Sequence, residues 1–76
     1  MANFKQVNKL VNRKFPHLDI EVVRGEGYVY FSGEDGYELR SIYTHPVSTS
    51  TEDVTRLAID EIESYLKEIE VYKEDV

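Results

Sequence analysis

The stretch Arg24-Gly-Glu-Gly-Tyr-Val-Tyr-Phe-Ser-Gly-Glu-Asp-Gly-Tyr37 decides how this chain folds. It contains all four glycines of the protein and four of its nine aromatic residues. Glycine supplies the positive-φ conformations that tight turns require, and alternating aromatic and β-branched residues are typical of a pleated strand. We therefore predict one strand over residues 28–32, held between two glycine-containing turns.

Two further strands are predicted on either side of this stretch. Residues 18–23 place apolar side chains at every second position, and the turn over residues 25–27 closes a hairpin. The turn over residues 33–36 reverses the chain again. Residues 37–44 then predict a third strand, which ends before Pro46 because proline cannot donate to a ladder. Hairpin-length connections allow only antiparallel neighbours, so we expect a three-stranded meander.

Helices are predicted at both ends of the chain. Apolar residues recur at helical spacing over residues 3–15, where Asn3 and Gln6 form a capping box. A longer apolar stripe predicts a helix over residues 51–72, with an acidic first turn that favours the helix dipole. This second helix is longer than a seven-residue strand, so its last turns should extend beyond the sheet. The apolar side chains expected to be partly uncovered there are among Ile69, Val71 and Tyr72.

Together these elements predict one α+β domain over residues 1–76. The expected order is α-β-β-β-α, a three-stranded antiparallel sheet with two helices packed on one face. A chain of 76 residues is near the lower limit of what folds alone. An enclosed catalytic cavity would take most of its core, which argues against an enzyme.

Composition restricts the chemistry further. The chain has no cysteine, which excludes disulfides and thiolate metal sites and fits a reducing cytoplasm. No apolar run reaches membrane-spanning length, so no membrane partner is expected. The formal net charge is −6, and the carboxylates are concentrated after residue 24.

The predicted central strand presents two different faces. Period-two alternation places Val29 and Phe31 on one face and Tyr28 and Tyr30 on the other. With the helices over Val29 and Phe31, both tyrosines stand on the open face. Tyrosine is enriched at interfaces, so this face is a candidate for partner binding or self-association. The alternative is that these rings are ordinary cross-strand pairs. The candidate interaction face comprises Tyr28, Tyr30, Arg40 and Ile42.

The predicted second helix carries a row of carboxylates. Such a row can imitate the spaced phosphates of a nucleic acid or contact a basic protein groove. The alternative is a merely solvated face, because Glu52–Arg56 and Glu63–Lys67 are i,i+4 pairs in the favoured orientation. The candidate acidic surface comprises Glu52, Asp53, Asp60, Glu63 and Glu70.

No catalytic, metal or cofactor motif is recognisable. His17 and His45 lack a clustered third ligand, and no serine has a glycine-framed nucleophile elbow. The α-β-β-β-α order is similar to that of double-stranded-RNA-binding domains. Those domains place lysines where this chain has carboxylates at residues 51–56, so direct nucleic-acid binding is not expected. We expect no catalytic residues and no cofactor.

The phrase Gly25-Glu-Gly-Tyr-Val-Tyr-Phe-Ser-Gly33, followed by a tyrosine-bearing strand and a long acidic helix, resembles small uncharacterised bacteriophage and prophage proteins. The resemblance covers residues 18–70, and that nine-residue phrase is its distinctive motif. It implies a phage-type accessory protein without enzymatic activity in the cytoplasm of a bacterial host.

Two functional hypotheses follow. The first is an accessory protein acting through protein–protein contacts, as a candidate homodimer or with a host or phage protein. The alternative is an acidic inhibitor of a host nucleic-acid enzyme, similar in size and charge to some anti-restriction and anti-CRISPR proteins, with the second helix imitating phosphates.

Overall fold

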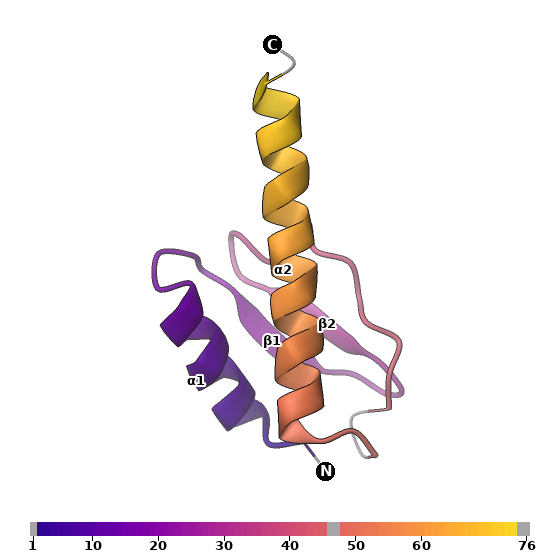
Figure 1. The fold of residues 1–76 in the computed structure, drawn as a ribbon. Helices are drawn as coiled ribbons and strands as arrows, with labels where there is room; N and C mark the ends of the chain where they lie inside the picture. The colour runs from indigo at the N-terminus through magenta and orange to yellow at the C-terminus, as the bar shows by residue number, and fades with distance from the viewer. Residues whose placement is uncertain (1, 46–47, 75–76) are drawn as a thin grey trace.

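Two helices pack on one side of a β-hairpin, and the chain order is α-β-β-α (Figure 1). The computed structural model describes residues 2–45 and 48–74, the last five of these by their backbone alone. The α+β class is confirmed, but the predicted third strand is not present as an element. The elements are α1 (Phe4–Lys14), β1 (Glu21–Arg24), β2 (Val29–Ser32) and α2 (Thr51–Glu74).

The first helix begins and ends within one residue of its predicted bounds of 3–15. Asn3 caps it, because its Oδ1 accepts the backbone N–H of Gln6 at 3.2 Å. The backbone N–H of Phe15 bonds to the carbonyl of Val11 at 2.9 Å, and the chain then leaves the helix before Pro16. The apolar stripe therefore faces inward, with Val11 fully buried.

The hairpin pairs β1 with β2 in antiparallel register. Val22 lies opposite Phe31, and the two strands meet at a turn where the N–H of Gly25 bonds to the carbonyl of Tyr28 at 2.9 Å. Both strands are shorter than predicted, four residues each, but lie inside or within one residue of the expected ranges. The predicted alternation is confirmed, because Val29 and Phe31 are buried.

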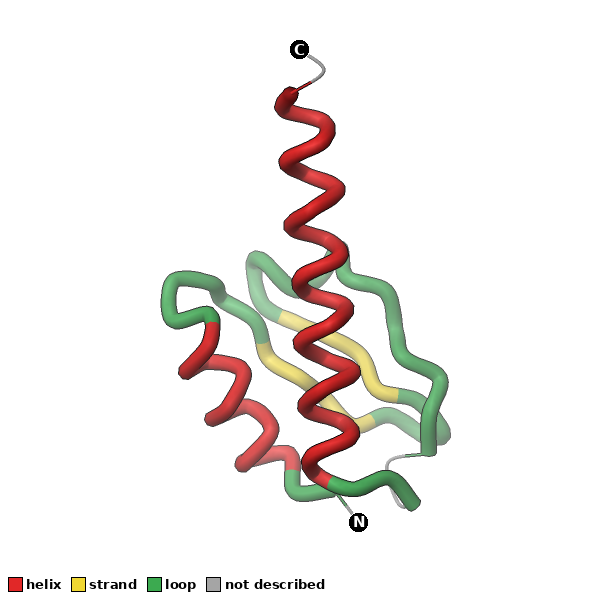
Figure 2. The backbone as a smooth tube through the Cα atoms, in the orientation of Figure 1, coloured by secondary structure: helices red, strands yellow, loops and turns green. Residues whose placement is uncertain are grey.

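The predicted strand over residues 37–44 is wrong except at one residue. The N–H groups of Gly36 and Tyr37 both bond to the carbonyl of Gly33, and that of Leu39 bonds to Gly36, so this stretch is a series of turns. Figure 2 draws the described part of the connection between β2 and α2 as loop. Only Ile42 pairs with β2, as an isolated bridge to Val29. The hydrogen-bond groups that a third strand needs are used by these local turns.

An asparagine of α1 closes the outer edge of β1. Val22 lies at a pair of the hairpin that is not hydrogen-bonded, so its backbone groups point away from β2. Its N–H donates to Oδ1 of Asn8 at 2.7 Å, and Nδ2 of Asn8 donates to the Val22 carbonyl at 2.9 Å. The side-chain amide thus takes the place of a neighbouring strand.

The second helix begins where the sequence predicts. The backbone N–H of Asp53 bonds to Oγ of Ser50 at 3.1 Å, so Ser50 caps the helix. The N–H of Asn3 donates to Oγ1 of Thr51 at 2.9 Å and ties the starts of the two helices together. Ion pairing between Lys14 and Glu63, 3.3 Å apart, links the end of α1 to the middle of α2.

One hydrophobic core lies between the helices and the inner face of the hairpin. The helices pack against each other, and α1 also packs on β1 (Figure 1). Both helices, the hairpin, the residues next to them and the connection after β2 contribute buried apolar side chains. These are Ala2, Val7, Val11, Phe15, Ile20, Val22, Val29, Phe31, Leu39, Val54, Ala58 and Ile62.

The C-terminal turns of α2 extend beyond the rest of the protein, as predicted (Figure 1). Among the side chains described for α2, the last fully buried one is that of Ile62, while the helix continues to Glu74. Ile69 is half-buried. The side chains of Val71 and Tyr72 lie outside the described residues.

Candidate functional site

Three tyrosines form a row on the side of the hairpin that faces away from the core. The ring centroids of Tyr28 and Tyr30 are 5.9 Å apart, and those of Tyr28 and Tyr43 are 6.5 Å apart. Tyr28 is half-buried at the centre of the row, Tyr30 is 37% exposed, and Tyr43 is 87% exposed. We call Tyr28, Tyr30 and Tyr43 the tyrosine face.

Tyr43 joins this face because of the single bridge between Ile42 and Val29. Those two residues exchange both backbone hydrogen bonds at 2.8 Å, which places Tyr43 opposite Tyr28. Alternation then directs Ile42 to the same side as Val29, where it packs against the core. The expectation that Ile42 stands beside Tyr28 and Tyr30 is therefore wrong, and Tyr43 was missed.

A glycine positions the central ring of the face. The ring of Tyr28 lies so close over Gly25 that a β-carbon on Gly25 would stand 2.5 Å from its Cζ. Any other residue at position 25 would push the ring away from the backbone. Beside the ring is an open hollow of about 690 Å³, lined by Arg24, Gly25, Glu26, Tyr28 and Tyr30. The turn thus positions the Tyr28 ring and lines the hollow next to it.

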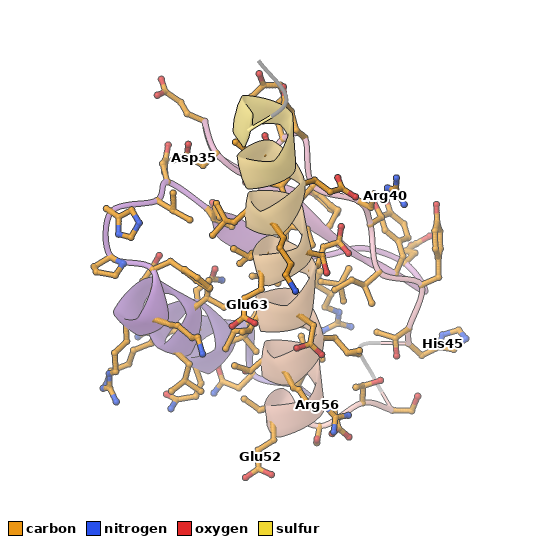
Figure 3. The ribbon with its side chains drawn as sticks, turned by 45° about the horizontal axis from the view of Figure 1, so that its top comes forward. Asp35, Arg40, His45, Glu52, Arg56 and Glu63 are labelled. Carbon is orange, nitrogen blue, oxygen red and sulfur yellow. The ribbon has the colours of Figure 1, made fainter. Side chains whose placement is uncertain are left out.

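Arg40, the fourth predicted member of the interaction face, lines a separate hollow beside α2. Its backbone N–H donates to Oε1 of Glu61 at 3.3 Å. The hollow measures about 280 Å³, and Figure 3 shows Arg40 on the connection next to the helix. Among the described residues, no ring contact joins Arg40 to the tyrosine face.

Two tyrosines near this second hollow interact with Glu38. The phenol of Tyr65 donates to Oε2 of Glu38, and this hydrogen bond raises the pKa of Tyr65 to about 12. A hydrogen bond to the same carboxylate, followed by its negative charge, raises the pKa of Tyr37. Both effects have the same cause, because the carboxylate favours the protonated phenol. This arrangement fixes the loop to the helix.

The predicted acidic surface is present as exposed side chains but is partly neutralised. Glu52, Asp53, Asp60 and Glu63 are all exposed. Oδ1 of Asp53 lies 3.2 Å from Nη2 of Arg56.

The ion pairs differ from those predicted on this helix. Arg56 pairs with Asp53 rather than with Glu52, and Glu63 pairs with Lys14 of α1 rather than with Lys67. Figure 3 shows Glu52 at the start of α2 and Glu63 on its α1 side. The side chain of Glu70 lies outside the described residues.

The described part of the chain offers neither a metal centre nor a membrane span. Among side chains of residues 2–45 and 48–69, no group of three or more His, Asp or Glu residues is placed to hold a metal ion. As far as the two helices are described, neither is long and apolar enough to cross a membrane.

Comparison of this chain with protein-family models, with curated proteins and with solved structures gives no significant match.

Proposed function

We propose that this chain is a small, non-enzymatic accessory protein of bacteriophage type that acts by binding another protein through its tyrosine face. The observation that carries the proposal is the row of Tyr28, Tyr30 and Tyr43 on the open side of the hairpin. Their rings contact one another outside the core.

The row has the properties of a prepared contact surface. Tyrosine rings supply a large apolar area with only two side-chain torsions to restrict, and their hydroxyls hydrogen-bond at the rim of a contact. Gly25 lets the Tyr28 ring lie against the turn, and the neighbouring rings hold it there. A partner would therefore meet a surface that needs little further ordering.

The alternative proposal, an acidic inhibitor that imitates a nucleic acid through α2, has weaker support. Phosphate imitation requires a row of free, evenly spaced carboxylates. Asp53 and Glu63 are paired with cations of this chain, and Glu61 accepts a backbone N–H. The α2 carboxylates thus hold the fold together in several places, whereas the rings of the tyrosine face contact one another on the side of the hairpin away from the core.

Affinity capture from a lysate of the natural host tests the tyrosine-face proposal. The wild-type chain should retain a partner that the double variant Tyr28→Ser/Tyr30→Ser loses. The matched control is Tyr37→Ser, because Tyr37 is 71% exposed and lies outside the tyrosine face. Equal capture by all three proteins would contradict the proposal.

Sedimentation equilibrium on the same proteins tests the homodimer. A wild-type dimer that becomes a monomer in the double variant, and remains a dimer in Tyr37→Ser, would make a second copy of the chain the partner. Salt separates the two functions further, because binding by an acidic row should weaken strongly at high ionic strength.

A further inference from the structure

The edges of the hairpin restrict how a partner can bind next to the tyrosine face. The most direct way to bind an extended segment at a sheet is to add it as a strand, through backbone hydrogen bonds. On β1 the outward groups of Val22 are taken by Asn8, and on β2 those of Val29 are taken by Ile42. Strand addition is therefore blocked at Val22 and at Val29, and a partner next to these two residues meets the face of the hairpin instead of its edges.

The face itself suits an uncharged, extended ligand. The two centroid separations give a row at most about 12 Å long, which is the length of about four residues in a polyproline II helix. Neighbouring rings are tilted by 36° and 43°, so the row is ridged rather than flat. The hollow beside it contains one cation, Arg24, and one carboxylate, Glu26, and so carries no net formal charge.

From these observations we infer that the tyrosine face binds a proline-rich segment of a partner protein in the polyproline II conformation. Such a segment has no internal hydrogen bonds and needs no free sheet edge, and its carbonyls can accept from tyrosine hydroxyls. Proline rings pack on aromatic side chains, and the segment loses little conformational entropy on binding. A nucleic acid would instead require net positive charge at the face. The inference rests on the proposed function and names the partner's chemistry.

Titration with a synthetic peptide tests the inference. The probe is a short proline-rich peptide of about ten residues, long enough to cover the row with flanks. The control peptide has the same length, with every proline replaced by alanine. Backbone amide shifts of the isotope-labelled full chain should move around Tyr28, Tyr30 and Tyr43 with the proline-rich peptide only.

Variants then localise the contact. Tyr43→Ala should weaken peptide binding by about twofold to tenfold, the range that follows from the loss of one aromatic contact. Because Tyr43 is 87% exposed, this change should leave the fold intact, so that a loss of binding reports on the contact itself. Tyr37→Ala removes an exposed ring outside the face and should leave the affinity unchanged.

Three results would overturn the inference. They are equal binding of the alanine peptide, equal weakening by Tyr37→Ala, and no shift changes with the proline-rich peptide. If host-partner capture depends on Tyr28 and Tyr30 while the proline-rich peptide fails to bind, only this inference is wrong. If capture ignores those tyrosines, the proposed function itself is wrong.

Discussion

The two faces of β2 and of the residue before it differ in burial. Val29 and Phe31 are buried against the helices, whereas Tyr28 and Tyr30, one position away, lie on the side without a helix. All four residues are typical of strands, so strand propensity does not distinguish them. The difference comes from the tertiary packing on each side, which teaches that one face serves stability and leaves the other available for contacts.

The largest loss of stability should follow from removing a buried side chain from the inner face of β2. Phe31→Ala is expected to cost about 3–5 kcal/mol of unfolding free energy, because it removes a buried ring and leaves a cavity. A domain of this size has only a few kcal/mol of stability, so the variant should be largely unfolded by circular dichroism. The matched change Tyr30→Ala, on the outer face, should cost less than about 1 kcal/mol in urea unfolding. Equal losses would remove the distinction between the faces.

The outer edge of β1 is closed by the side chain of Asn8 at Val22. Asn8→Ala removes both partners of the Val22 backbone, and leaving such groups unpaired costs about 1–3 kcal/mol. Asn12→Ala makes the same change at an exposed position of α1 and serves as the control. Urea unfolding of both variants measures the difference. A similar small loss in each would show that water replaces the amide and that the edge is open.

A pH titration compares the tyrosine face with Tyr65, which lies on α2. The folded-state pKa of Tyr65 is raised from its ordinary value of 10.0 to about 12, so the bond to Glu38 stabilises the fold fully below pH 10. That contribution should disappear as the pH rises through about 12. Glu38→Gln replaces the carboxylate that accepts this hydrogen bond with an uncharged amide and should lower the Tyr65 pKa, measured by phenolate absorbance, with Tyr65→Phe to identify the signal. An unchanged pKa in Glu38→Gln would contradict the assignment.

The smallest change in stability should come from Gly25→Ala, which disturbs the outer face alone. The added β-carbon displaces the Tyr28 ring, a movable side chain, and the unfolding free energy should change by less than about 1 kcal/mol. Ring-current shifts of Tyr28 and Tyr43 should nevertheless change in the proton spectrum.

Gly33→Ala is the contrasting control for this experiment. Gly33 has a φ of +96°, and its β-carbon would stand 2.4 Å from the backbone oxygen of Asp19. Because a backbone atom cannot move aside as a ring can, this variant should lose about 1–3 kcal/mol. Unchanged ring shifts in Gly25→Ala would show that the glycine does not position the Tyr28 ring.

Local patterns of sequence predicted the helices and the hairpin. Both helices have strong apolar periodicity and polar caps at Asn3 and Ser50, and each begins within one residue of its predicted start. The third strand failed because residues 37–44 also alternate, yet the chain buries Leu39 and packs Ile42 against the core, three positions apart. That spacing is incompatible with the two-residue period of a strand.

The candidate site could be predicted only in part, because one of its three tyrosines is placed by a pairing between distant parts of the chain. Tyr28 and Tyr30 were found because alternation within one strand assigns them to one face. Tyr43 belongs to the row only through the register of Ile42 with Val29, a long-range pairing that composition and spacing leave open. Likewise, Lys14 and Glu63 pair across two helices, where the local pattern pointed to Lys67.

By itself, the sequence determined which segments become helices, where the hairpin turns and which residues of β2 face inward, because these depend on neighbours a few positions away. Only the tertiary structure decided that the sheet stops at two strands, that Asn8 closes its edge and that a third tyrosine completes the outer row. The first follows from the packing of Leu39 and Ile42 against the core and from the local turns that use the backbone groups of this stretch. The other two depend on groups far apart in the chain that come together only in the folded protein.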